Sequence, residues 1–249
     1  MVNWSDLDAE IQLWRDEGRI PTLWWRDDDA QKDSAALRRL SALSAKYAVP
    51  LALAAIPKGC EQSLVDVVED NPGLSILQHG YSHLSYAPVT ERKCELGSHR
   101  PIVTITDELT RGLQQLREMF GSRFHAVLVP PWNRLSLDVV DSLPASGFVG
   151  LSTLGPRSSG SVELVQVNVH VDLIDWKGGR KFAGEERALG QLIDHLRLRR
   201  LEKVDPLEAT GVMTHHLVHD EPLWVFLERL LSFTHEAGVR WCSTDELFR

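Results

Sequence analysis

The sequence contains few cysteines and no long apolar run. Its 3 cysteines are odd in number and lie far apart, at Cys60, Cys94 and Cys242. Such spacing is not typical of a disulfide framework or of a thiolate zinc site. No apolar run approaches the roughly 20 residues that span a bilayer. The N-terminus, MVNWSDLDAEIQLW, lacks the basic-then-apolar pattern of a signal peptide. We therefore expect a cytoplasmic protein with no membrane partner.

The chain also lacks an excess of positive charge. Its formal net charge is -8 over 249 residues, which argues against nucleic acid as the main partner. With 43% hydrophobic and 25% charged residues, the composition is that of an ordinary globular protein. We therefore expect a small-molecule or oligosaccharide substrate rather than a polyanionic partner.

Eight apolar, β-rich segments alternate with helical patterns. Most are apolar on both faces, which is typical of parallel strands covered by helices. The predicted strands cover residues 20–29, 49–57, 74–79, 125–131, 147–153, 163–176, 209–216 and 238–243. The polar stretch 85–105 is predicted to be a long loop, and such loops often line sites.

Repeated strand–helix units favour an α/β fold, an irregular (β/α) barrel of about seven to eight parallel strands. An open doubly wound sheet is the alternative. No glycine-rich phosphate loop follows the first predicted strand, which disfavours a nucleotide-binding version of that sheet. No repeat or linker divides the chain, so we expect a single domain over residues 1–249.

Chemically active side chains stand at five of the eight predicted strand ends. In such folds the carboxyl ends of the strands form the site. The relevant positions are residues 27–29, His79, and residues 130–133, 172–176 and 215–216. Because these ends converge on one rim, their side chains are candidates for a shared site.

Three aspartates and two histidines are candidate metal ligands. Asp27, Asp28 and Asp29 are consecutive, and like charges this close raise one another's pKa. A solvated strand end tolerates that, and a bound cation also explains it. His79 and His83 are four residues apart, so both rings can face one point. Two imidazoles with a carboxylate commonly bind a divalent transition metal, although two hydrogen-bonded, half-buried histidines are the alternative.

Two later motifs add carboxylates and imidazoles. These are HVDLIDW at 170–176 and VMTHH at 212–216. A carboxylate near an imidazole can orient it and raise its pKa, which suits a general acid. Capping, surface charge and packing are the alternative roles. Trp132 and Trp176 flank the motifs, and their flat rings suit the face of a sugar, although tryptophan is also a core residue.

The order of these motifs resembles that of the polysaccharide deacetylase superfamily. These metal-dependent hydrolases remove N- or O-acetyl groups from sugars on an irregular (β/α) barrel. Their motifs are a strand-end Asp-Asp, then H-S/T-x-x-H, R-x-P-x-G/Y, a D-x-x-D-W-type segment and L-x-H. This chain has, in that order, the aspartates at 27–29, His79-x-x-x-His83, VPPWN (129–133), DLIDW (172–176) and MTH (213–215). The resemblance runs from the first predicted strand to the last third of the chain.

Two positions depart from those motifs. Gly80 stands where the family has serine or threonine. Val129 stands where the family has an arginine that helps orient the catalytic base. Arg26 and Arg134 are the candidates to compensate for that arginine. The departures point to an unusual substrate.

The resemblance leaves two registers for the aspartates. With Arg26 in the place of the family's threonine, Asp28 is the base and Asp29 the metal ligand, and Ala30 stands where the family has glycine. A shift by one residue makes Asp27 the base and Asp28 the ligand. We favour the first register, and Asp28 is essential in both.

The resemblance then implies a metal-dependent deacetylase. Asp29, His79 and His83 are expected to bind a divalent metal, with zinc preferred, and Asp28 to act as base. His215, oriented by Asp175, is expected to protonate the leaving group. Strand alternation would point His170 to the same rim. The predicted substrate-binding residues are Asp27, Pro131, Trp132, Asn133, His170, Trp176 and His216.

Two other functions remain open from the sequence. Hydrolysis of a small linear or cyclic amide fits the missing arginine and the expected cytoplasmic location. A carbohydrate-binding barrel without catalysis is the second alternative, and the intact Asp-Asp and His-x-x-x-His sets count against it.

Overall fold

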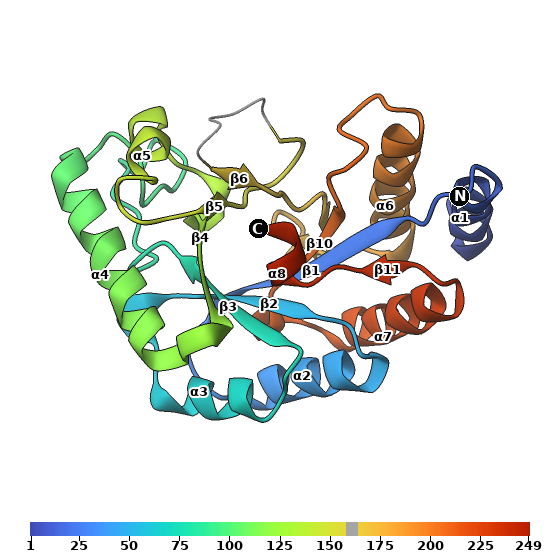
Figure 1. Cartoon of the computed structure of the whole chain (residues 1–249), viewed down its shortest axis with the longest axis horizontal. Helices are drawn as coiled ribbons and strands as arrows, with labels where there is room; N and C mark the ends of the chain where they lie inside the picture. The colour runs from blue at the N-terminus through green and yellow to red at the C-terminus, as the bar shows by residue number, and fades with distance from the viewer. Residues whose placement is uncertain (158–163) are drawn as a thin grey trace.

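The computed structural model describes residues 1–157 and 164–249, and it contains a parallel sheet that curls into a barrel (Figure 1). Neighbouring strands along the sheet are all parallel. In spatial order they are β6 (Val165–Gln166), β5 (Gly150–Leu151), β4 (Phe124–Val129), β3 (Leu74–His79), β2 (Leu51–Ala55), β1 (Thr22–Ala30), β10 (Thr210–Thr214) and β7 (Val171–Asp172). A further strand, β11 (Arg240–Trp241), pairs with the start of β1. This arrangement confirms the predicted irregular (β/α) barrel.

One segment, residues 165–172, joins the two edges of the sheet by changing its partner halfway. The backbone N–H groups of Val167 and Val169 donate to carbonyls of the β5 segment, whereas that of His170 donates to Gly211 on β10. The prediction of one continuous strand over 163–176 is therefore wrong. After β7 the chain forms β8 (Ile174–Asp175), which pairs antiparallel with β9 (Lys181–Phe182). Residue 163, the first of that predicted strand, lies outside the described residues.

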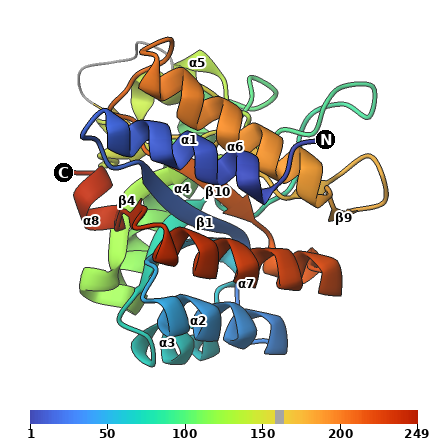
Figure 2. The ribbon, with the colours of Figure 1, turned by 90° about the vertical axis from the view of Figure 1, so that its right-hand side faces the viewer.

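Helices cover the outside of the barrel, and Figure 2 shows α1 lying along α6. The helices are α1 (Trp4–Asp16), α2 (Ala35–Tyr47), α3 (Gln62–Glu69), α4 (Ile102–Phe120), α5 (Leu137–Ser142), α6 (Glu185–Arg200), α7 (Glu221–Glu236) and α8 (Thr244–Leu247). Short 3-10 turns are η1 (Pro57–Gly59), η2 (Gly121–Arg123), η3 (Pro131–Asn133) and η4 (His216–Val218). The predicted loop 85–105 ends earlier than expected because α4 begins directly after Pro101. Within the described ranges, no helix is both long and apolar enough to cross a membrane.

Alternate strand residues face two separate cores. Trp24 joins the apolar side chains that fill the barrel, together with Ala52, Ala54, Val127 and Met213. Its neighbour Trp25 belongs instead to the larger core that includes the helices. The strands β1, β2, β3 and β10 are thus buried on both faces over most of their length, as the apolar runs in the sequence predict. This packing fixes the strand ends on which the site is built.

Gly211→Ala is expected to destabilise the barrel where its two edges meet. A Cβ at Gly211 would lie 2.5 Å from Nε1 of Trp24 and 2.6 Å from the backbone oxygen of Asn168. Backbone cannot move aside as a flexible side chain can, and overpacking of this kind costs about 1–3 kcal/mol. Urea unfolding measures this loss.

The matched control is Gly190→Ala in α6, where nothing lies within 4 Å of the added Cβ. Alanine favours a helix over glycine by about 1 kcal/mol, so this variant is expected to be at least as stable as wild type. A Gly211→Ala protein with wild-type stability would contradict the close packing at the closure.

Candidate active site

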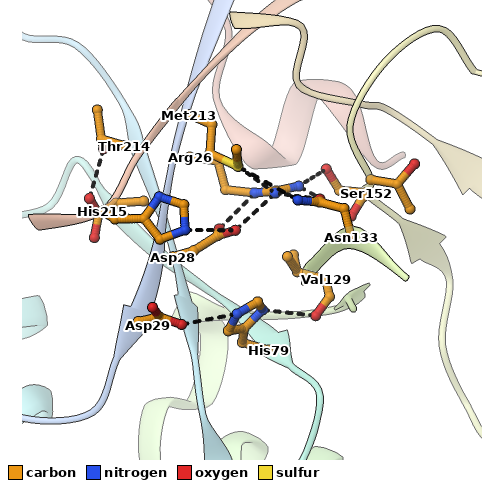
Figure 3. A network of polar contacts seen from close by, with 12 residues as sticks. Arg26, Asp28, Asp29, His79, Val129, Asn133, Ser152, Met213, Thr214 and His215 are labelled. Carbon is orange, nitrogen blue, oxygen red and sulfur yellow. Dashed lines mark hydrogen bonds and ion pairs between the residues drawn. The ribbon is translucent and has the colours of Figure 1, made fainter. Parts of the chain in front are cut away.

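The carboxyl ends of several parallel strands meet at one rim of the barrel (Figure 3). Asp28 and Asp29 lie at the end of β1, and His79 is the last residue of β3. His215 follows β10, and Asn133 lies in η3 after β4. The structure thus brings together residues that are far apart in the sequence, as parallel strands in a barrel do.

The end of β1 is irregular, which separates the three aspartates. The pairing of β1 with β2 shifts register between Asp27 and Ala30, and Asp29 has a φ of 74°. Successive side chains of a regular strand point to opposite faces, and such an irregularity re-aims one of them. As a result, Asp28 and Asp29 both reach the rim but contact different residues.

Asp29, His79 and His83 form a group whose donor atoms lie within 4.8 Å of one another. Oδ1 of Asp29 is 3.2 Å from Nε2 of His79 and 3.3 Å from Nε2 of His83. Nδ1 of His79 lies 3.0 Å from the carbonyl oxygen of Val129, and only an Nδ1–H can donate there. A neutral His79 therefore turns the lone pair of Nε2 toward a carboxylate. These atoms repel unless a proton or a metal cation lies between them, and the fixed second nitrogen is typical of a metal-binding histidine.

Asp29, His79 and His83 also shift one another's pKa values. Burial acts to raise the pKa of Asp29, but the hydrogen bond and charge of His79 outweigh it and lower that pKa. Burial and the charge of His79 lower the pKa of His83 to about 4. Burial acts to lower the pKa of His79, but Asp29 and Asp28 raise it overall. Metal binding requires an ionised Asp29 and neutral imidazoles, so a proton competes with a metal chiefly at His79.

Arg26 lies fully buried beneath the rim and binds both oxygens of the Asp28 carboxylate. Its Nε is 2.8 Å from Oδ1 and its Nη2 is 3.0 Å from Oδ2. Nη1 donates to Oγ of Ser152 at 2.7 Å, and Nη2 also donates to Oδ1 of Asn133 at 3.0 Å. This bidentate contact holds Asp28 in one orientation.

Of the two arginines considered as replacements at Val129, Arg26 is the one that contacts Asp28. Val129 is buried among the apolar side chains inside the barrel. Arg134, the other candidate, donates instead to the backbone carbonyl of Lys93. The sequence itself offers a guanidinium two residues before Asp28, on the same strand.

Asp27 and His216 form a buried pair behind the rim. Asp27 accepts hydrogen bonds from Oγ1 of Thr214 at 2.7 Å and from the backbone N–H of His216 at 2.9 Å, and it also pairs with Nδ1 of His216. Burial acts to raise the pKa of Asp27, but His216 holds it below its ordinary value. Asp27 is 0% exposed and His216 2%, and the two side chains engage each other, which argues against the predicted substrate-binding roles. The donor group with His79 and His83 contains Asp29 rather than Asp28, which disfavours the register in which Asp27 is the base and Asp28 the ligand.

His215 faces Asp28 across the rim. Its Nε2 is 3.9 Å from Oδ2 of Asp28, and its ring packs edge-on against Trp176 with centroids 4.6 Å apart. Nε1 of Trp176 donates to Oδ2 of Asp172 at 2.8 Å. Burial raises the pKa of Asp172 despite the opposing influence of His215. Asp172 thus connects to His215 through Trp176.

The prediction that Asp175 orients His215 is wrong. Asp175 accepts hydrogen bonds from the backbone N–H groups of Lys177 at 3.2 Å and Gly178 at 3.0 Å. It therefore stabilises the turn between β8 and β9. The two aspartates of the DLIDW motif separate because the chain leaves β7 and enters this hairpin.

The η3 turn forms another side of the rim. Trp132 and Asn133 have φ values of 56° and 54°, and the Trp132 ring lies 4.5 Å from that of His83. Asn133 is occupied by Arg26, and Pro131 is buried. Trp176 is 41% exposed, so its ring is accessible from solvent beside His215. Trp132 and Trp176 therefore remain the aromatic candidates for substrate contact.

His170 lies away from this rim, which corrects the expectation from strand alternation. Its ring stacks on His195 of α6 with centroids 3.5 Å apart, and its Nε2 is 3.6 Å from Oε2 of Glu208. The strand is interrupted at this point, and His170 lies level with Gly211 rather than with the end of β10. A substrate at the rim does not reach this buried side chain.

His170, His195 and Glu208 form a second group whose donor atoms lie within 4.8 Å of one another. However, the backbone N–H of Gly211 donates to Nδ1 of His170 at 3.0 Å. A neutral His170 therefore carries its proton on Nε2, the atom that a metal would need. The two imidazoles are also nearly parallel, at 17°, so their nitrogens do not converge on one point. We assign no metal to this group.

Two residues that contact the site lie outside the predicted motifs. Ser152, just after β5, accepts from Arg26, and Glu95 accepts from the turn that carries His83. No local pattern marks either residue. One is a serine after a two-residue strand, and the other is an isolated glutamate in a polar loop.

Three solved structures with a similar fold are described as a candidate deacetylase, an esterase and a pseudoenzyme. A candidate polysaccharide deacetylase from Mycobacterium smegmatis is 16% identical, with a TM-score of 0.62 over 92% of this chain and 88% of that chain. A family 4 acetyl xylan esterase from Clostridium thermocellum, in complex with a cobalt ion, is 15% identical, with a TM-score of 0.56 over 91% of this chain and 90% of that chain. This chain has the polysaccharide deacetylase fold.

The third similar structure is a family 4 pseudoenzyme from Bacillus anthracis. It is 13% identical, with a TM-score of 0.59 over 92% of this chain and 66% of that chain. No protein-family model matches the sequence, and no curated protein matches it either. The polysaccharide deacetylase fold that the motif order predicts is confirmed, whereas activity has to be argued from the site itself.

Proposed function

We propose that this protein is a metal-dependent hydrolase that removes an acyl group, expected to be N-acetyl, from a carbohydrate or related small molecule. One observation carries the proposal. A buried Arg26–Asp28 pair shares a rim with a carboxylate and two imidazoles, those of Asp29, His79 and His83. The geometry supports the register in which Asp28 is the base and Asp29 the ligand.

Asp29, His79 and His83 are the residues that would hold a divalent metal, and zinc is the metal we expect for this ligand set. The fit rests on the carboxylate and two imidazoles, whose donor atoms lie within 4.8 Å of one another, and on the contact between Oδ1 of Asp29 and Nε2 of His79, where a proton or a metal cation can lie. A divalent metal bound here lowers the pKa of water and polarises the acyl oxygen.

Asp28 is proposed to take the proton from the attacking water. Arg26 contacts both oxygens of the carboxylate and so holds it in one orientation. General bases of this kind contribute about 10²–10⁴-fold to the rate when they lie within reach of the proton. The low exposure of the pair keeps bulk water from weakening this contact.

His215 is proposed to protonate the leaving amine or alkoxide. Its Nε2 lies 3.9 Å from Oδ2 of Asp28, and the Trp176 ring packs edge-on against it. Trp132 and Trp176 flank the rim, and their flat rings suit the apolar face of a sugar. These positions support a carbohydrate substrate.

Both alternatives from the sequence lose support. The missing arginine favoured a small-amide hydrolase, but Arg26 supplies a guanidinium to Asp28. The Bacillus anthracis pseudoenzyme shows that this fold also occurs without activity. The complete set of Asp28, Asp29, His79, His83 and His215 at one rim argues for catalysis in this chain.

Substitutions of the neighbouring aspartates Asp28 and Asp29 are expected to affect metal binding differently, although both lower activity. His79→Ala and Asp29→Ala should each lose both metal and activity. Asp28→Asn should retain about one metal per chain but release acetate about 10²–10⁴-fold more slowly. Elemental mass spectrometry measures the metal, and acetate release from N-acetylated oligosaccharides measures activity. A parallel assay with linear and cyclic amides distinguishes the substrate classes.

Asp8→Asn is the control, since Asp8 is an exposed aspartate on α1. It should match wild type in both measurements. Metal loss in Asp28→Asn with retention in Asp29→Ala would move the register by one residue. Wild-type protein that takes up no metal after addition of zinc would refute the proposed function.

We expect that an arginine on β4 can partly replace Arg26 of β1 as the partner of Asp28. Arg26→Thr removes the partner of Asp28 and should lower kcat at least about 10-fold, since a charge-assisted bidentate contact is lost. Adding Val129→Arg places a guanidinium on β4, where the resembling family has it, and should restore part of that loss. Steady-state kinetics with each variant measures the effect.

Val129→Arg alone is the matched control, and it should be less stable than wild type because it buries a second guanidinium near Arg26. If Arg26→Thr turned over substrate at the wild-type rate, Arg26 would have no role in orienting the base.

A further inference from the structure

The turn between β3 and the long loop, residues 80–83, is anchored by one buried carboxylate. Glu95 is 0% exposed, and its Oε1 accepts from the backbone N–H of Ser82 at 2.7 Å, from Oγ of Ser82 at 2.9 Å and from the N–H of Tyr81 at 3.3 Å. Its Oε2 accepts from the N–H of His83 at 3.1 Å. Three successive backbone N–H groups around one carboxylate form a concave anion site.

This anchor acts on the backbone of His83 itself. His83 has a φ of 56°, which is unfavourable for a residue with a side chain. The bond from its N–H to Glu95 holds that conformation, and the conformation turns Nε2 to within 3.3 Å of Asp29. Strained residues persist where their surroundings over-determine them. Glu95 thus fixes the direction of an imidazole without touching its ring.

The glycine at position 80 belongs to the same arrangement. Its φ is 56°, and a Cβ there would lie 2.3 Å from Oε2 of Glu95 and 2.6 Å from Cγ of Pro131. The carboxylate therefore occupies the space that a side chain at position 80 would need. This explains why Gly80 stands where the resembling motif has serine or threonine, because Glu95 supports the turn from another segment.

We propose that Glu95 is a positioning residue of the metal site, which holds His83 against Asp29. The inference rests on the proposed function, since it presumes that Asp29, His79 and His83 bind a divalent metal. Residues that orient metal ligands from behind typically contribute 10–100-fold to metal affinity. Glu95 should do so although it lies in a loop of no recognisable motif.

The test is a zinc titration of the full chain against a chromogenic chelator. Glu95→Ala should raise the Kd for zinc about 10–100-fold. Glu95→Gln keeps one oxygen for Tyr81 and Ser82 but loses the acceptor for His83, so its Kd should fall between those of wild type and Glu95→Ala. Glu91→Gln, in the same loop and paired with His99 at the surface, should leave the Kd unchanged.

Thermal unfolding with excess chelator separates positioning from stability. A purely structural role would lower the metal-free Tm of Glu95→Gln while leaving its zinc Kd at the wild-type value, and this result would overturn the proposal. If Glu95→Ala does not fold, Glu95→Gln alone decides. Wild-type protein that binds no zinc refutes the metal site and this inference together, whereas wild-type affinity in both variants refutes only the role of Glu95.

Discussion

The Arg26 guanidinium lies inside the barrel, and the geometry of the rim depends on it. Removing a charge from water is costly, and such a group persists only where its hydrogen bonds are satisfied. Arg26 contacts Asp28 on its own strand, Ser152 after β5 and Asn133 in η3. One side chain therefore links three segments of the rim. Its loss would leave the buried Asp28 carboxylate without its bidentate partner.

The three consecutive aspartates are compatible because each has a different partner. Asp27 pairs with His216 behind the rim, Asp28 with Arg26 inside the barrel, and Asp29 with two imidazoles at the surface of the site. The register shift in β1 and the positive φ of Asp29 allow this division. Asp29 is the one of the three whose carboxylate is approached by two imidazoles, and the proposed metal would bind there.

Much of the fold and of the site follows from the sequence, for reasons that can be named. Long apolar runs such as those of β1 to β4 predict strands buried on both faces, and parallel strands bring His79 and the aspartates to one rim. The prediction of one strand around His170 was wrong because the backbone pairing of this segment switches from the β5 side to β10. No local sequence pattern reveals such a switch. For the same reason, Asp175 could not be separated from Asp172.

Partners contributed by distant segments are the other part that sequence pattern misses. Glu95 and Ser152 are ordinary polar residues in the sequence, and only folding brings them to His83 and Arg26. The sequence left Arg26 and Arg134 as candidates, and the contacts of Arg26 with Asp28 distinguish them. Asp27 and His216 are buried because they pair with each other, and residue type alone does not predict that pairing.

Asp29, His79 and His83 are proposed to hold a metal beside the Arg26-paired base. Anomalous X-ray diffraction at the zinc edge, on crystals grown with zinc, tests it most directly. We expect one peak at about 2.0–2.2 Å from an oxygen of Asp29 and from Nε2 of both histidines. A peak at His170, His195 and Glu208 instead, or none at the rim, would contradict the account.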